Sequence, residues 1–339
     1  MDKQKKILVI GGLAALVLIG GWLAVSHVAT SRAEDKLYAF LDRYQLRDAV
    51  HWQSLSASPF GTATLKGITI RLGEGQNAEK GAIERIHLSD LEDSEDRKSA
   101  RVEVTGIAGG DGRSLLNRTS LIQAAGRADL PPFSLTMDWR LDRKDDTGAL
   151  HFSLEQPKAF DGKFDLELSR VRDLLRLADR LAHGGGDDFQ ELAGGFGFLG
   201  PLGALAVVSQ KIQQMEVRAV RASIRDEGYG ERSRALAKRH DFDAAPGEGS
   251  ADVQRERWFK EKIDAGRAQC KKDPEAAFGG APLSRDDCLA LLDFVTGESA
   301  KLTVKMEPAR PVSLEQLLEG GSSRDPYRSI RLLEMRLDN

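Results

Sequence analysis

The sequence predicts an α+β protein, in which an N-terminal transmembrane helix precedes an antiparallel β-sheet that is apolar on one side. Three observations predict this class. An uncharged stretch of nineteen residues, Ile7–Val25, lies near the N-terminus. Apolar and polar residues alternate along several later segments, which is the period of a half-buried strand. Between about residues 228 and 298 the apolar residues instead recur with the period of a helix, which predicts a helical insertion.

The uncharged stretch is long enough to cross a bilayer as a helix, which needs roughly 20 apolar residues. Lys3, Lys5 and Lys6 precede it and favour a cytoplasmic N-terminus, so that the body lies outside. Trp22 would then lie at the membrane interface. A cleaved secretory signal is the alternative, with an apolar region of typically about 7–15 residues and a small-x-small site. Residues 26–33 offer no clean site of that kind, and either reading exports the body.

We therefore expect a single-pass protein of a bacterial inner membrane, with a cytoplasmic N-terminus and a periplasmic body. The expected organisation is a leader at 1–6, a transmembrane helix at 7–29, a juxtamembrane helix at 30–48, a β-rich body with helices at 49–227, a helical insertion at 228–298 and C-terminal strands at 299–339.

The strongest strand signal comes from three consecutive segments around 135–141, 150–154 and 164–168. In each of them, apolar residues alternate with polar ones, and polar turn segments connect them. This pattern predicts an antiparallel meander with one apolar and one solvated face. Within the body, helices are predicted at 171–182 and 201–212. Together with the helices of the insertion they suffice to cover the apolar face, which favours a filled core over an open groove.

An earlier strand contains a change of phase. Ile68 and Ile70 alternate with polar residues, whereas Leu65 is in the opposite phase. Gly67 lies at the switch and predicts a β-bulge. Further strands are predicted at 215–225, 301–306 and 329–337.

The two cysteines, Cys270 and Cys288, lie on two predicted helices at 252–272 and 285–296. Each cysteine is on the apolar face of its helix, and prolines and glycines between the helices predict a tight connection. The cysteines are therefore expected to face each other across a helical hairpin and to pair in an oxidising compartment. Two buried free thiols are the alternative. A zinc site would need more ligands than two cysteines supply.

No pattern of a catalytic or cofactor site is present, so we expect a protein that is not an enzyme and has no cofactor or metal. None of the six histidines forms a metal-binding pair at helical spacing, and the chain lacks a G-x-S-x-G motif. The glycines of Gly195–Gly200 match a dinucleotide fingerprint in spacing, but a predicted helix and loop precede them instead of a strand. The net charge of −3 and the 6% content of aromatic residues argue against nucleic-acid binding.

One nearly uninterrupted apolar segment, 196–208, is a candidate surface for contact with lipid or a protein partner. A buried loop and helix is the alternative interpretation. The residues proposed for contact are Phe196, Phe198, Leu199, Leu202, Leu205, Val207 and Val208.

A lysine-containing leader, a single predicted span and a short helix precede the segment VHWQSLSASPFGTATLKGITI. With Gly61, Leu65, Ile68 and Ile70 in a G-x-x-x-L-x-x-I-x-I pattern, this opening resembles AsmA-like and related uncharacterised envelope proteins of Gram-negative bacteria. The resemblance covers about the first 110 residues and the C-terminal stretch LTVKMEPARPVSLEQLLEG. It implies a periplasmic β-rich body in envelope biogenesis or lipid traffic, and it carries no catalytic residues.

Three functions follow as hypotheses. The first is a non-enzymatic envelope protein that acts as a scaffold or contacts lipid. The second is a bitopic subunit of a secretion or division complex, whose body binds a protein partner. The third is an envelope hydrolase whose active-site residues meet only in the folded chain.

Overall fold

The computed structural model describes residues 46–58, 61–72, 79–119, 129–173, 213–242, 249–317 and 327–339. It also describes single residues or pairs at 34, 37–38, 41–42, 122–123, 126, 175–176 and 245. The predicted transmembrane helix, Trp22 and the apolar segment 196–208 lie outside these residues. Among the helices within them, none has the length and apolar character needed to cross a bilayer.

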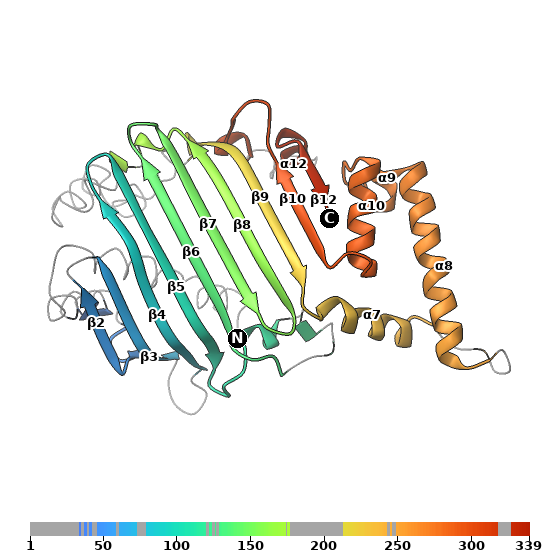
Figure 1. Cartoon of the computed structure of the whole chain (residues 1–339), viewed down its shortest axis with the longest axis horizontal. Coiled ribbons are helices and arrows are strands. Elements are labelled where there is room, and N and C mark those ends of the chain that lie inside the picture. Colours follow the sequence, from blue (N-terminus) through green and yellow to red (C-terminus); the bar gives the residue numbers. More distant parts are fainter. Residues whose placement is uncertain are drawn as a thin grey trace, which may run out of the picture.

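Twelve strands form one large antiparallel sheet, which confirms the α+β class in its coarse form (Figure 1). The strands are β1 (Val50–His51), β2 (Ser54–Ser58), β3 (Thr62–Leu72), β4 (Glu79–Asp93), β5 (Arg97–Gly109), β6 (Phe133–Asp142), β7 (Thr147–Gln156), β8 (Phe160–Ser169), β9 (Glu216–Asp226), β10 (Lys301–Met306), β11 (Val312–Ser313) and β12 (Met335–Asp338). Their order is β1-β3-β4-β5-β6-β7-β8-β9-β10-β12, with β2 beside β3 and β11 beside β9. The predicted meander is confirmed as β6, β7 and β8.

Helices are concentrated between β9 and β10. They are α7 (Tyr229–His240), α8 (Ala251–Lys272), α9 (Pro274–Ala277) and α10 (Arg285–Thr296); outside this group lie the 3-10 helix η2 (Leu115–Arg118) and α12 (Arg328–Leu332). We call residues 229–296 the helical arm. Figure 1 shows the arm beside the β12 edge of the sheet, where α10 packs against β12 and β10. The arm's apolar cluster includes Met335 and Leu337 of β12, which pair with Met306 and Val304, so the arm meets the apolar face of the sheet at this edge. Most of the predicted helices at 171–182 and 201–212 lies outside the described residues.

The disulfide between Cys270 and Cys288 is present, as predicted. It joins α8 to α10, and both cysteines are buried with Leu283 in the arm's own apolar cluster. The two helices approach closely because Gly266 has no side chain, and Leu292 packs against its backbone. The helical hairpin is thus built from local signals that the sequence contains.

Three neighbouring strands, β3, β4 and β5, change the face on which they present apolar residues along one line across the sheet. Gly67 of β3 and Gly106 of β5 both have positive φ, 62° and 71°, on either side of Glu84 in β4. The pairing of β3 with β4 keeps its register past Gly67, so the predicted bulge there is wrong. The shift occurs between β5 and β6, where Thr105 and Gly106 lie opposite Ser134. β3, β4 and β5 change phase at paired positions, so the register among these three strands is preserved, whereas the register between β5 and β6 shifts.

The predicted strand at 329–337 is also wrong in its first half. Residues Arg328–Leu332 form α12, and only Met335–Asp338 pair with β10. Leu333 is buried in a cluster with Val217 and Val312, beyond the end of β10. Contact with this cluster outweighs the weak alternation of apolar residues in the segment.

Candidate functional site

The apolar face of the sheet is the candidate functional surface. Register aligns apolar side chains from the five strands β6 to β10 into cross-strand rows, because directly paired residues point to the same side. The middle row, which we call the apolar strip, consists of Met137, Phe152, Phe164, Ala222 and Val304. The row on one side of it is Trp139, Leu150, Leu166, Val220 and Met306, and the row on the other is Leu135, Leu154, Gly162, Ile224 and Leu302.

The apolar strip is only half-buried. Four clusters of buried residues lie around it, and none of its five members belongs to any of these clusters in the described part of the chain. One cluster contains Leu41 and packs over β1 to β6, and a second lies where β8 and β9 meet Val312. A third involves Leu130 and Ala159, and the fourth is in the arm. The strip is therefore an apolar area bounded by well-packed regions.

A buried polar network stabilises the third of these regions. Gln156 at the end of β7 is fully buried, accepts a hydrogen bond from the Ser114 hydroxyl, and donates to the carbonyl of Pro131 at 3.0 Å. Asn117 donates to the carbonyl of Leu130 and accepts from its N–H. Because these buried polar groups have hydrogen-bond partners, they link η2 and Leu130 to the end of β7 without leaving an unsatisfied group.

The opposite face of the sheet is polar and contains the histidines that alternation placed there. His87 Nδ1 lies 2.9 Å from the Thr64 hydroxyl. His151 contacts Asp165, is paired with Asp138 in the register, and has a side chain that is 44% exposed. These contacts are cross-strand pairs on a solvated surface and do not enclose a reaction site.

The aspartates of the β6–β7 hairpin have structural roles, as turn chemistry predicts. Asp142 accepts a hydrogen bond from the N–H of Asp145 at 3.0 Å. Asp146 accepts from the N–H of Arg172 at 2.8 Å. Hydrogen bonding to the Asp145 N–H, followed by the Arg97 guanidinium, lowers the pKa of Asp142. These carboxylates are therefore used to hold the turn and its neighbours.

The candidate contact residues in 196–208 and the interface residue Trp22 lie outside the described residues, so they stay predictions. The structure brings Cys270 and Cys288 together as predicted. The apolar strip was not singled out from the sequence, although alternation had indicated its members in β6 to β8. The signal that identifies it is the register between strands, which the sequence does not contain.

Comparison with models of protein families and with curated proteins finds no match to this chain.

Proposed function

We propose that this chain is a non-enzymatic, membrane-anchored protein of the bacterial envelope, whose sheet contacts lipid acyl chains through its apolar face. The observation that carries the proposal is the apolar strip: five aligned apolar side chains that stay half-buried in the middle of the sheet. A contiguous apolar patch on a folded body is typical of a surface that meets lipid or another protein. The resemblance to AsmA-like envelope proteins favours lipid as the contact.

Two further features support an envelope location. The uncharged residues 7–25 follow a lysine-containing leader, as expected of an anchor with a cytoplasmic N-terminus. The Cys270–Cys288 disulfide fits an oxidising compartment such as the periplasm. A periplasmic body attached to the inner membrane would have direct access to phospholipid.

The proposal is tested by photocrosslinking in the full chain, expressed in bacterial membranes. A photoreactive phenylalanine analogue replaces Phe152, whose side chain belongs to the apolar strip. The matched control places the analogue at His151, because adjacent residues of a strand point to opposite faces. We expect phospholipid adducts, detected by mass spectrometry, at position 152 and none at position 151.

The alternatives give different results in the same experiment. Crosslinks at position 152 that reach only other residues of this chain would mean that the face is ordinary core, and the lipid proposal would fail. Equal lipid labelling at positions 151 and 152 would mean nonspecific proximity to the membrane, which would also count against it.

A second candidate function is binding of an envelope protein partner through the helical arm. The arm stands beside the sheet edge, and it contains the two large apolar side chains that are most exposed in the described part of the chain. Val253 is 64% exposed and Val295 is 55% exposed. A photocrosslinker at Val295, with Glu298 as a neighbouring control position, would capture a discrete protein partner if this function holds. Capture of lipid alone would argue against it.

A further inference from the structure

A hollow of about 280 Å³ lies on the polar face near the end of the β6–β7 hairpin. Arg140 and Arg218 line it from β6 and β9, and Gly148 and Ala149 of β7 lie between them. These two strands are three strand spacings apart, about 14 Å. On β7 the small residues leave space beside Arg140, and Glu167 of β8 follows in the same cross-strand row before β9. We call this feature the arginine hollow.

A β-bulge brings Arg218 to this position. Glu167 pairs with Ala219 and Leu168 pairs with Val217, so Arg218 is the extra residue on β9. Val217 and Ala219 on either side of it are both buried, whereas Arg218 is exposed. A bulge redirects a side chain at a single position while the rest of the strand keeps its pairing. Here it directs a guanidinium into the arginine hollow.

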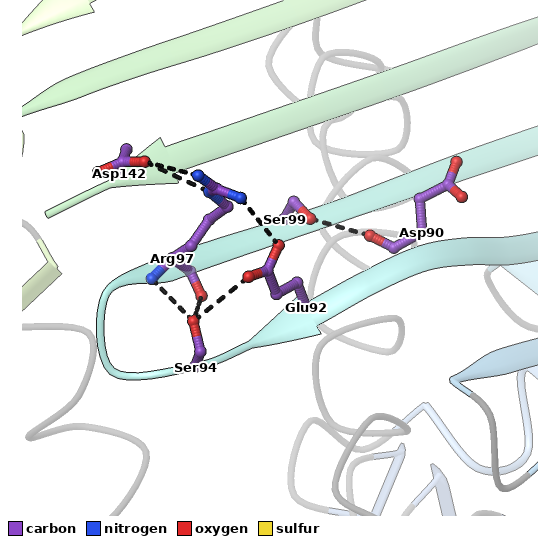
Figure 2. A network of polar contacts seen from close by, with 6 residues as sticks. All are labelled: Asp90, Glu92, Ser94, Arg97, Ser99 and Asp142. Carbon is purple, nitrogen blue, oxygen red and sulfur yellow. Dashed lines mark hydrogen bonds and ion pairs between the residues drawn. The ribbon is translucent and has the colours of Figure 1, made fainter. Parts of the chain in front are cut away.

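The carboxylates around the hollow are already paired with other arginines. Asp142 lines the hollow and is held by Arg97, which also reaches Glu92 across the β4–β5 hairpin (Figure 2). Glu167 also lines the hollow, and its Oε1 lies 3.1 Å from Nη1 of Arg221.

A third nearby carboxylate, Glu216, accepts from Arg170 at 3.1 Å. By contrast, within the described residues the side chains of Arg140 and Arg218 make no hydrogen bond and no ion pair. Two guanidinium groups therefore face one hollow without a counter-ion from the described residues.

We propose that Arg140 and Arg218 form a binding site for a phosphate-class oxyanion in the arginine hollow. Guanidinium groups suit this ligand because their planar N–H donors match the oxygens of a phosphate and remain charged at any physiological pH. Arg97 and Arg221 neutralise the two carboxylates that also line the hollow, which reduces their repulsion of an anion. The site lies on the face opposite the apolar strip and does not depend on the function proposed above.

The test measures anion binding by isothermal titration calorimetry with the full chain in a non-ionic detergent at constant ionic strength. One arm uses inorganic phosphate, and the other uses short-chain phosphatidylglycerol, since the phosphate group could belong to a free anion or to a lipid headgroup. The variants are Arg140→Gln, Arg218→Gln and their combination. Arg336→Gln on β12 is the control, because Arg336 is also exposed and does not line the hollow.

We expect saturable binding of at least one of the two ligands. Each single substitution should weaken it at least about tenfold, because the bound anion loses a hydrogen bond to a charged group. The control should bind like the unmodified chain. Binding of phosphate would identify a free anion as sufficient, and binding of phosphatidylglycerol alone would identify a headgroup site. Absence of saturable binding in both arms, or equal binding by the double variant, would overturn the proposal.

Discussion

The sheet and the helical arm are stabilised by different means. In the sheet, buried apolar residues from many strands form clusters, and the largest one extends over β1 to β6. In the arm, the 22 residues of α8 contain only two buried side chains, Gln254 and Cys270. The arm relies instead on a few specific links, which are the disulfide, a capping box and ion pairs.

The ion pairs of the arm centre on Arg267 of α8. Its guanidinium binds Asp293 of α10 at 3.0 Å and also contacts Glu298 just beyond that helix. Hydrogen bonds to these two carboxylates, with Asp293 first, raise the pKa of Arg267. A region with a small apolar core thus concentrates its stability in a few residues, whereas a large sheet distributes it. Substitutions in the sheet should therefore lower the stability of the whole fold, whereas substitutions in the arm should destabilise the arm alone.

The largest expected effect is in the sheet. Ile68→Ala removes a side chain that is 2% exposed and should lower the free energy of unfolding by about 4 kcal/mol, through lost burial and the cavity left behind. Denaturant unfolding measures the change. Thr69→Ala, one residue further and exposed, is the control and should stay within about 0.5 kcal/mol of the unmodified chain. A similar loss in both variants would mean that Ile68 is not part of a packed core.

Removing the disulfide should have a smaller and more local effect. Cys270→Ser with Cys288→Ser opens a link across 18 residues and should destabilise the arm by about 3 kcal/mol. Hydrogen exchange should accelerate in α8 and α10 and stay unchanged in β6 to β8. Equal acceleration in the meander would show that the arm and the sheet unfold as one unit, which would contradict the comparison.

Asp287 connects the arm to the sheet, and its substitution should destabilise the contact between α10 and β12. Its carboxylate accepts hydrogen bonds from the Ser284 N–H at 3.0 Å and from the Leu337 N–H of β12. Asp287→Ala removes one half of the capping box, the bond to the Ser284 N–H, and leaves the Leu337 N–H without its partner, a loss of about 2 kcal/mol.

The matched control for Asp287→Ala is Asp286→Ala, since Asp286 is exposed on the same first turn. Hydrogen exchange at the Leu337 amide should rise only in the Asp287 variant. If the exchange rate of the Leu337 amide is the same in both variants, Asp287 of α10 does not protect the edge strand β12.

The smallest expected effect is a pH dependence at the β6–β7 hairpin. The pKa of Asp142 is lowered by the Asp145 N–H and by Arg97, so its contribution to stability is present above the unfolded value of about 3.9. That contribution is lost as the pH falls through the still lower folded pKa. Asp142→Asn should therefore be less stable than the unmodified chain at pH 6, with the difference shrinking below about pH 4.

Thermal unfolding at several pH values measures this difference, and Asp145→Asn serves as its control. The Asp145 substitution keeps the backbone N–H that Asp142 accepts, so its stability relative to the unmodified chain should not follow the same pH profile. A constant difference between Asp142→Asn and the unmodified chain at all pH values would contradict the assignment.

Local signals predicted several elements to the residue. The helix Arg285–Thr296 begins at the Ser284 capping box and ends at Gly297, whose φ of 82° few other residues adopt. Strand Lys301–Met306 follows its alternation. The cysteines could be paired from sequence because each lies on the apolar side of a helix in a short hairpin. In these cases the information lies within a few residues of the element itself.

Other features depended on partners that are distant in the chain. The helix at Arg328–Leu332 forms where the predicted strand was wrong, because the adjoining Leu333 packs against residues more than a hundred positions away. The bulge at Thr105–Gly106 exists only relative to Ser134. Likewise, Arg140 and Arg218 line one hollow because of the register of the strands between them, with small residues on β7, and because of the bulge at Arg218.

By itself, the sequence determined the α+β class, the meander, the helical hairpin and its disulfide, because these follow from periodicity, capping and turn residues that act over short distances. The position of the arm beside the β12 edge, the shared line of phase change in β3 to β5, and the apolar strip could be seen only in the folded chain. Each of these depends on strand register and on packing between distant segments, and a shift of one residue would move every side chain of a strand to the other face.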